Sequence, residues 1–371
     1  MSYDGLEDKD LPLKLRLMGL LWNLGWFVRP NVKVFRYQEG KRTRDQFTDI
    51  DVLAIKILPL QDQMIAVSSA KSGKESDPAE LFWLCGVKSY FDASFAYYIR
   101  PKANILKTKA LCDKLGIIAL NDEQLGLLEQ RFSVRTEESP YFSIDTYTKI
   151  NKYFTELKGA RVSLYNYVTE KFWTDPMNNQ LLRIITGIRD VSKLDLSNDC
   201  KLFMKYYLAS LLALPLHRFS HQLVRVPGTM LETELETALM GGELARGEKE
   251  KIIQACKSFI FEFAETAGLS QASVANIDST FQRVSQLDYF KDILDLLVTM
   301  VQNYRYSSYV PRMLDALFFQ LVKKPGLVPD IRFVTLPDIH KDEWEQIAKL
   351  TKDILVFSQR VGGLGKSEMR L

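Results

Sequence analysis

Apolar residues recur every three or four positions near the start of the chain. Between Leu11 and Gly25 they have the spacing of one helix face, and the glycine is suited to end that helix. Residues 26–37 and 48–71 instead contain short apolar runs and alternations bounded by polar turns, a pattern typical of strands. This order predicts a helix followed by three short strands.

A second helix is predicted to begin at Asp77. Asp77 is suited to the N-cap, Pro78 to the first helical position, and Glu80 to the third position after the cap, as in a capping box. The elements expected next are a strand, a helix and a strand, over residues 95–99, 109–116 and 117–120.

The pattern becomes helical nearly throughout after a polar segment that ends at Pro140. We therefore predict two domains, an α/β domain over residues 1–135 and an all-α domain over residues 141–371. The helices predicted in the second domain span residues 144–157, 160–173, 178–192, 197–224, 229–245, 247–267, 284–304, 310–323 and 341–360.

Length and composition agree with this division. A chain of 371 residues, 46% of them hydrophobic, exceeds the usual size of one core. Its formal net charge of +3 is close to balance, so a nucleic-acid partner would need a local basic patch. The four cysteines form no CxxC pair, which argues against a zinc knuckle and a disulfide framework.

The sequence also bears on localisation. The first ten residues are acidic and lack the basic and then apolar pattern of a signal peptide. No uncharged apolar run approaches the roughly 20 residues that span a bilayer. We expect a cytoplasmic protein without a membrane partner.

Candidate chemistry lies on the second and third predicted strands. Side chains alternate between the two faces of a strand, so Asp51 shares a face with Leu53, and Ser69 shares one with Lys71. If the two strands pair as a hairpin, the carboxylate of Asp51 and the ammonium of Lys71 lie at the same edge of the sheet.

Two segments here resemble the motifs of a known family. The D-V-L-A segment from Asp51 and the K-S-G-K segment from Lys71 resemble those of the PD-(D/E)XK, or restriction-endonuclease-like, nucleases. The segment from Ala110 to Leu128 resembles that family's closing pattern, so the resemblance covers residues 10–132. It implies a restriction-endonuclease-like fold for the N-terminal domain.

The resemblance also implies a metal site. In that family two carboxylates and a backbone carbonyl hold one or two Mg²⁺ ions, with Mn²⁺ as a substitute, and the metal activates water for phosphodiester hydrolysis. By position, Asp51 and the Ala70 carbonyl would be metal ligands. Lys71 would be the lysine that orients the water.

Ser69 departs from the family pattern, because an Asp or Glu is expected two residues before the lysine. A neutral hydroxyl is a poor ligand for Mg²⁺. Glu80 on the following helix is the residue expected to restore the charge, as both catalytic group and metal ligand. Glu75 and Asp49 are the alternatives.

Basic residues beside these strands are candidates for binding nucleic acid. Lys41, Arg42 and Arg44 cluster at a predicted turn, and Lys74 ends the K-S-G-K segment. They could hold phosphates and so position DNA without reading its sequence. A solvated hairpin tip is the other interpretation of the cluster.

Two further patterns favour structural roles. His217 and His221 are one helical turn apart, as in a metal pair, but without a nearby acidic ligand they indicate a polar helix face. Residues 303–312 interleave tyrosines with arginines, which suits stacking on bases. Packing at a helix junction is the favoured interpretation there.

Two functions remain open at this stage. One is a Mg²⁺-dependent nuclease acting on DNA, which the resemblance associates with restriction or anti-phage defence, with a helical domain that binds a protein partner or regulates activity. The other is a catalytically inactive nuclease-fold subunit that binds protein or nucleic acid within a larger complex.

Overall fold

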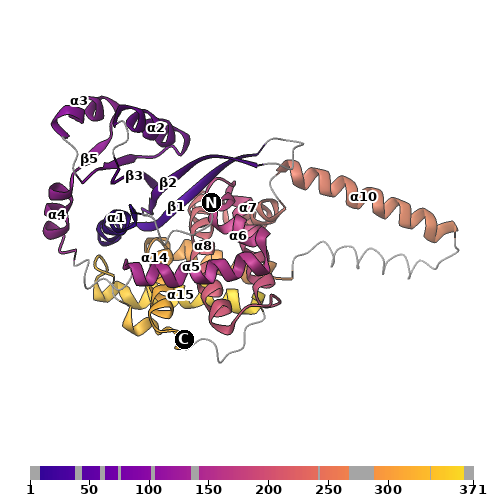
Figure 1. The fold of residues 1–371 in the computed structure, drawn as a ribbon. Helices are drawn as coiled ribbons and strands as arrows, with labels where there is room; N and C mark the ends of the chain where they lie inside the picture. The colour runs from indigo at the N-terminus through magenta and orange to yellow at the C-terminus, as the bar shows by residue number, and fades with distance from the viewer. Residues whose placement is uncertain are drawn as a thin grey trace.

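The structure is a computed structural model that describes residues 9–37, 44–58, 63–73, 77–101, 105–134, 142–240, 243–266, 288–334 and 336–362 (Figure 1). Its N-terminal part is α/β and the remainder is mostly helical, as expected for the fold class at this level. The predicted domain boundary at residues 135–141 lies outside the described residues.

Five strands form one mixed sheet, in which their order is their order along the chain. Strands β1 to β3 are antiparallel, whereas β4 and β5 run parallel to β3. Helices α2 and α3 make the crossovers that parallel neighbours require. The bounds are β1 (Phe27–Tyr37), β2 (Arg44–Lys56), β3 (Met64–Ala70), α2 (Asp77–Tyr90), β4 (Phe95–Ile99), α3 (Ile105–Leu115) and β5 (Ile118–Leu120).

Helix α1 (Leu11–Asn23) precedes the sheet and ends as predicted. Gly25 has a φ of +89°, a left-handed conformation that glycine adopts without strain. Its N–H donates to the Trp22 carbonyl, and the Trp26 N–H donates to the Leu21 carbonyl, both at 3.0 Å. This pair of bonds closes the helix and directs the chain into β1.

The two faces of the sheet are covered differently. Figure 1 shows α2 and α3 on the side away from the helical part, and α1 on the side that faces it. Leu81 and Leu84 of α2 pack on one face with Leu53 and Val67. The core on the other face includes Leu17, Met18 and Leu21 of α1 together with Val52, Ala54 and Ala66.

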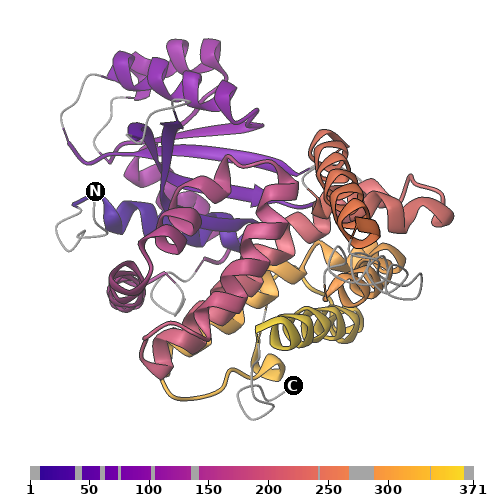
Figure 2. The same ribbon diagram turned by 90° about the vertical axis from the view of Figure 1, so that its right-hand side faces the viewer.

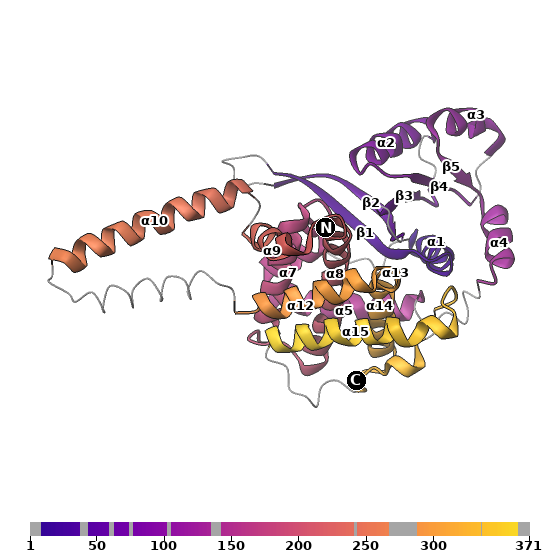
Figure 3. The same cartoon turned by 180° about the vertical axis from the view of Figure 1, so that it is seen from behind.

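The helical part is arranged around α8, which contacts α7, α12, α14 and α15 (Figures 2 and 3). Most of the C-terminal half of α8 is buried, as expected of a helix that is apolar nearly all round. The helices that follow β5 along the chain are α4 (Asp122–Arg131), which still belongs to the α/β part, and then α5 (Ile144–Ala160), α6 (Val162–Thr169), η2 (Lys171–Trp173), α7 (Met177–Val191), α8 (Asn198–Leu223), η3 (Gly228–Met230), α9 (Leu231–Leu239), α10 (Glu243–Thr266), α12 (Phe290–Gln302), α13 (Tyr304–Ser307), α14 (Val310–Lys323), η4 (Ile331–Phe333) and α15 (Lys341–Gly362).

Two predicted helices in this part were wrong in extent. The one expected over 229–245 is interrupted, because α9 ends at Leu239 and α10 begins at Glu243. The sequence between the two helices contains Gly241-Gly242, and glycine has a low helix propensity. The one expected over 160–173 ends at Thr169 and is followed by the separate turn η2.

The α/β part and the helical part share one hydrophobic core. Trp22 of α1 contacts Phe142 and Phe319, with ring centroids 5.8 and 6.1 Å apart and edge-to-face geometry. The apolar cluster is continuous from α1 and β1 into α8 and α14. The two parts are therefore joined through buried side chains as well as through the chain itself.

Helix α10 extends away from the rest of the molecule (Figure 3). Three of its large apolar side chains, those of Ile252, Phe259 and Phe263, are mostly exposed. Their spacing of seven and four residues places them on one helix face. Within the described ranges, no helix has both the length and the apolar character needed to cross a bilayer.

His217 lies in the core, so the expectation of a polar helix face was wrong for this residue. Its side chain is buried, and Nδ1 is 2.9 Å from the Ser307 hydroxyl. Burial, together with the nearby His221, lowers the pKa of His217 from 6.5 to about 4. The imidazole is therefore neutral in the folded protein at neutral pH.

This lowered pKa predicts a loss of stability in acid. The unfolded chain binds a proton at His217 near pH 6.5, whereas the folded protein resists it until about pH 4. The contribution of His217 to the free energy of unfolding is fully present above its pKa in the unfolded chain. About 2.5 kcal/mol of this free energy is lost on going from neutral pH to about pH 4.5. Urea unfolding at both pH values should show a smaller pH-dependent loss for His217→Gln than for the wild type. The same change at exposed His340 serves as the control and should leave that loss unaltered.

Candidate functional site

Strands β2 and β3 stop pairing next to Asp51. β2 stays paired with β1 on both sides of this residue, but its pairing with β3 ends at Val52 and Ser68, beyond which β3 continues against β4. The Asp51 carboxylate occupies this point, with Oδ2 accepting the Ala70 N–H at 2.8 Å. The side chain, only 2% exposed, thus satisfies a backbone donor that the ladder leaves unpaired.

Lys71 lies beside this carboxylate, with its Nζ 3.4 Å from Asp51 Oδ2. The predicted meeting of an acid from one strand and an amine from the next is therefore confirmed as geometry. Burial alone would lower the pKa of the half-buried Lys71, but the carboxylates of Asp51, Asp49 and Glu80 outweigh it and raise the pKa. The ammonium stays charged at neutral pH.

Glu80 reaches the site from α2, as expected for the residue that would compensate for Ser69. The buried Ser69 hydroxyl donates to Glu80 Oε1 at 2.5 Å. The helix start near Asp77 directs Glu80 towards β3, one turn into α2. The alternative Glu75 lies outside the described residues. The other alternative, Asp49, is near enough to help raise the pKa of Lys71.

A second ammonium, which the sequence interpretation missed, completes the group. Lys14 of α1 places its Nζ 2.9 Å from Asp51 Oδ1 and donates to Asn31 Oδ1 at 2.7 Å. Its side chain is only 6% exposed. The signal available in the sequence was a single charge one turn before Leu17 and Met18, on the otherwise apolar face of the first helix.

The Asp51 carboxylate has protein partners on both oxygens. Oδ1 contacts the Lys14 ammonium, and Oδ2 accepts the Ala70 N–H and contacts Lys71. Mg²⁺ requires oxygen ligands at about 2.0–2.1 Å in octahedral geometry, and an ammonium cannot share that position. The residues present therefore do not fit a Mg²⁺ or Mn²⁺ ion at Asp51 in this arrangement. In the described part of the chain, no three His, Cys, Asp or Glu side chains are grouped so that they could hold a metal.

Comparison with known proteins does not place the chain in a family. No family model matches it, and neither a curated protein nor a solved structure does. The interpretation of the site therefore rests on its own geometry.

Of the four basic residues predicted to bind nucleic acid, only Arg44 is among the described residues. Lys41, Arg42 and Lys74 lie outside the described residues. Arg44 begins β2, where it pairs with Tyr37 at the end of the long β1–β2 hairpin. Figures 1 and 3 show this hairpin extending from the sheet over α7 towards the start of α10.

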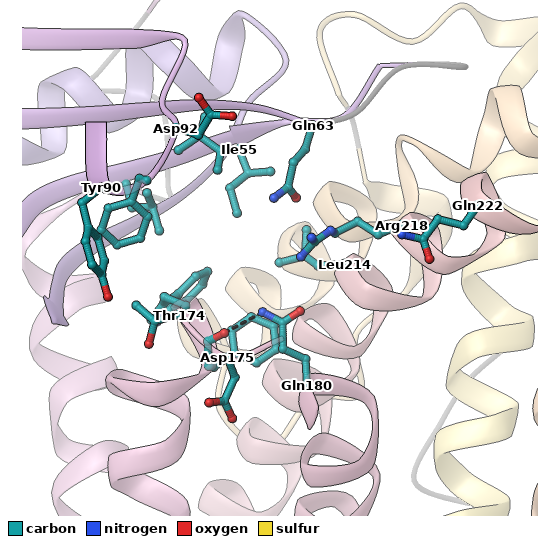
Figure 4. A pocket seen from close by; sticks show the side chains of 15 residues that line it. Ile55, Gln63, Tyr90, Asp92, Thr174, Asp175, Gln180, Leu214, Arg218 and Gln222 are labelled. Atoms are coloured by element: carbon teal, nitrogen blue, oxygen red, sulfur yellow. Dashed lines mark hydrogen bonds between the residues drawn. The ribbon is translucent and has the colours of Figure 1, made fainter. Parts of the chain in front are cut away.

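A pocket of about 540 Å³ lies between the sheet and the helical part, where the C-terminal residues of β2 and the start of β3 line it. Figure 4 shows Ile55, Gln63 and Tyr90 on one side, facing Leu214 and Arg218 of α8 on the other. Its volume is in the range of small-molecule sites. None of the described residues predicted for the nuclease-like site lines this pocket.

The segment rich in tyrosine and arginine has the structural role favoured from its sequence. Arg312 is buried, and its guanidinium donates to Asp338 at 2.7 Å and to the Trp22 carbonyl at 2.8 Å. Arg305 forms an ion pair with Glu343. These arginines hold the helical part together and join it to α1.

Proposed function

We propose that this protein binds DNA through a nuclease-like α/β part that does not hydrolyse it. The proposal corresponds to an inactive nuclease-fold subunit that serves as a binding module. The observation that carries it is the Asp51 carboxylate: by the resemblance it would be a metal-binding acid, but it is buried and bound on both oxygens by protein groups.

The order of the elements supports a nuclease-like architecture. A helix, three antiparallel strands, a crossover helix and a parallel strand follow one another in the order expected from the resemblance. Asp51 on the second strand and Lys71 at the end of the third lie together at one rim of the sheet. Without Asp51 and Lys71 side by side, the order of the elements would indicate only an α/β fold.

The charges at the rim argue against hydrolysis. A metal-dependent nuclease needs carboxylate oxygens that are free to take a divalent ion. Here the buried Lys14 ammonium contacts Oδ1 of Asp51, and the Ala70 N–H donates to Oδ2. No step of phosphodiester cleavage is therefore assigned to this site.

The ammonium of Lys71 supports binding of a phosphate backbone. Its side chain is 25% exposed, so one end of this buried group of charges faces solvent. The basic residues Lys41, Arg42, Arg44 and Lys74 follow or precede the same strands in the sequence. Phosphate contacts of this kind position DNA without reading its bases.

A second candidate function is the Mg²⁺-dependent DNA nuclease. The contact between Ser69 and Glu80 favours it, because it brings a second carboxylate to the strand that carries Lys71. A protein partner for the helical part remains part of either proposal, supported by the exposed apolar face of α10.

Fluorescence anisotropy with a short labelled DNA duplex tests the proposed function. We expect salt-dependent binding of the full chain without cleavage in Mg²⁺ or Mn²⁺. Replacing Lys41, Arg42, Arg44 and Lys74 together by serine should weaken binding and reduce the slope of log Kd against log salt by about 0.9 for each lost phosphate contact. The matched control replaces four exposed lysines of the helical part, Lys193, Lys323, Lys324 and Lys349.

The possible results are distinct. Binding without cleavage that the first variant loses and the control retains supports the binding module. Metal-dependent cleavage that Lys71→Ala abolishes would establish the nuclease instead. If the wild type binds neither duplex nor single-stranded DNA at low salt, the proposed function is wrong.

A further inference from the structure

Lys14 is held in the interior by two oxygen acceptors from different strands. Asp51 Oδ1 of β2 lies at 2.9 Å and Asn31 Oδ1 of β1 at 2.7 Å. A buried ammonium is stable only when its protons are bonded and its charge is balanced. The enclosure of Lys14 by a carboxylate and an amide oxygen meets both requirements.

The backbone at Asn31 is adapted to this contact. Asn31 lies opposite Asp51, between the pairs Pro30 with Val52 and Val32 with Ile50. Its φ is +51°, a left-handed conformation that is uncommon within a strand and that asparagine tolerates better than most residues. In this conformation the Asn31 side chain presents its amide oxygen to the Lys14 ammonium at 2.7 Å.

Helix α1 is held over the rim by side-chain contacts made just before and just after Lys14. Asp10, just before the helix, accepts the Ser72 N–H at 2.6 Å and also the Ser72 hydroxyl. Two residues after Lys14, the Arg16 guanidinium binds Glu129 of α4 at 2.7 Å. The ammonium of Lys14 is thus delivered by a helix that is anchored to the end of β3 and to α4.

We propose that the Lys14 ammonium is the built-in cation of this rim: it occupies the position between Asp51 and Asn31 that a divalent cation would otherwise take. The inference rests on the proposed function and gives the physical reason for it. Lysine brings donors and no acceptor, so it satisfies the same oxygens that a metal ion would bind and excludes the ion by charge and by space. Removing this one ammonium opens a site for a divalent cation.

The charge at position 14 determines whether each variant should bind divalent cations more tightly or more weakly than the wild type. Lys14→Gln removes the positive charge, and Lys14→Glu reverses it and adds a carboxylate next to Asp51 and Asn31. Carboxylate, amide and water oxygens are the ligands that Mg²⁺ and Mn²⁺ prefer. Divalent affinity should therefore increase from the wild type to Lys14→Gln and again to Lys14→Glu.

Titration of the 371-residue chain with Mn²⁺, by calorimetry and by the change in Tm, tests this inference. We expect no Mn²⁺ binding that depends on Asp51 in the wild type, and binding at least tenfold tighter in Lys14→Glu. Asp51→Asn in the Lys14→Glu background should abolish that binding. Lys193→Glu, which makes the same charge change on the exposed surface, is the control.

Two outcomes would overturn the inference. One is wild-type Mn²⁺ binding that Asp51→Asn removes while that variant keeps a native circular dichroism spectrum, a measurement that does not require any Lys14 variant to fold. The other is a Lys14→Gln or Lys14→Glu protein with a native circular dichroism spectrum that binds Mn²⁺ no better than Lys193→Glu. DNA binding of the wild type is also measured with EDTA in place of metal, so a failure of the proposed function is separate from either result.

Discussion

Arg29→Met is expected to lower the free energy of unfolding by about 3–5 kcal/mol, because it leaves the carboxylate of Asp315 buried without its partner. Arg29 of β1 donates to both oxygens of Asp315 on α14, at 2.5 and 2.7 Å, and to the Ser210 hydroxyl of α8 at 3.1 Å. Asp315 is fully buried. Urea unfolding near neutral pH measures the loss.

The double variant Arg29→Met with Asp315→Leu separates pairing from packing. It should recover most of the lost stability, because both buried charges are removed together and apolar groups take their place. The matched control is Arg332→Ala, which breaks an ion pair with Asp330 in which the arginine is exposed, and which should leave the Tm nearly unchanged. A single variant as stable as the wild type would show that this ion pair does not hold the sheet to the helices.

Asp51→Ala is expected to destabilise the fold by a similar amount, about 3–5 kcal/mol, whether or not metal is present. The change leaves the Lys14 ammonium, 6% exposed, without its carboxylate and the Ala70 N–H without its acceptor. By contrast, replacing a catalytic acid in an open site usually changes the stability of the fold little, or even increases it. Thermal unfolding with and without EDTA measures the effect.

Lys14→Met added to Asp51→Ala should restore much of this stability, because it removes the buried positive charge that Asp51 balances in the wild type. Asp49→Ala is the control, since Asp49 lies on the same strand and is less buried. Equal stability of Asp51→Ala and the wild type would contradict the role assigned here to Asp51. A loss that Lys14→Met fails to reduce would assign the cost to the Ala70 N–H instead.

The sequence predicted the local elements because their signals are local. The spacing of leucines before Gly25 gave the first helix and its end, and Gly25 has the left-handed conformation that this end requires. Alternation along two strands placed Asp51 and Lys71 at one rim, where the structure brings them within 3.4 Å. The helix start near Asp77 likewise directs Glu80 to Ser69.

Which groups neutralise Asp51 was decided only by tertiary structure. Lys14 lies 37 residues before Asp51 in the sequence, and its place in an amphipathic helix gives no sign of which carboxylate it meets. The same holds for Arg29 and Asp315, which are 286 residues apart. Periodicity reports which face of an element is buried, whereas the partner across a core depends on how the elements pack.

The sequence by itself determined the α/β part, the helical remainder, and an acid and an amine at a shared edge of the sheet. Only the packing of α1 against that edge determined that a second ammonium, that of Lys14, contacts the Asp51 carboxylate. The reason is physical: hydrogen bonds within helices and strands follow from neighbours in the chain, but the balance of buried charge depends on side chains that meet only after the elements have packed together.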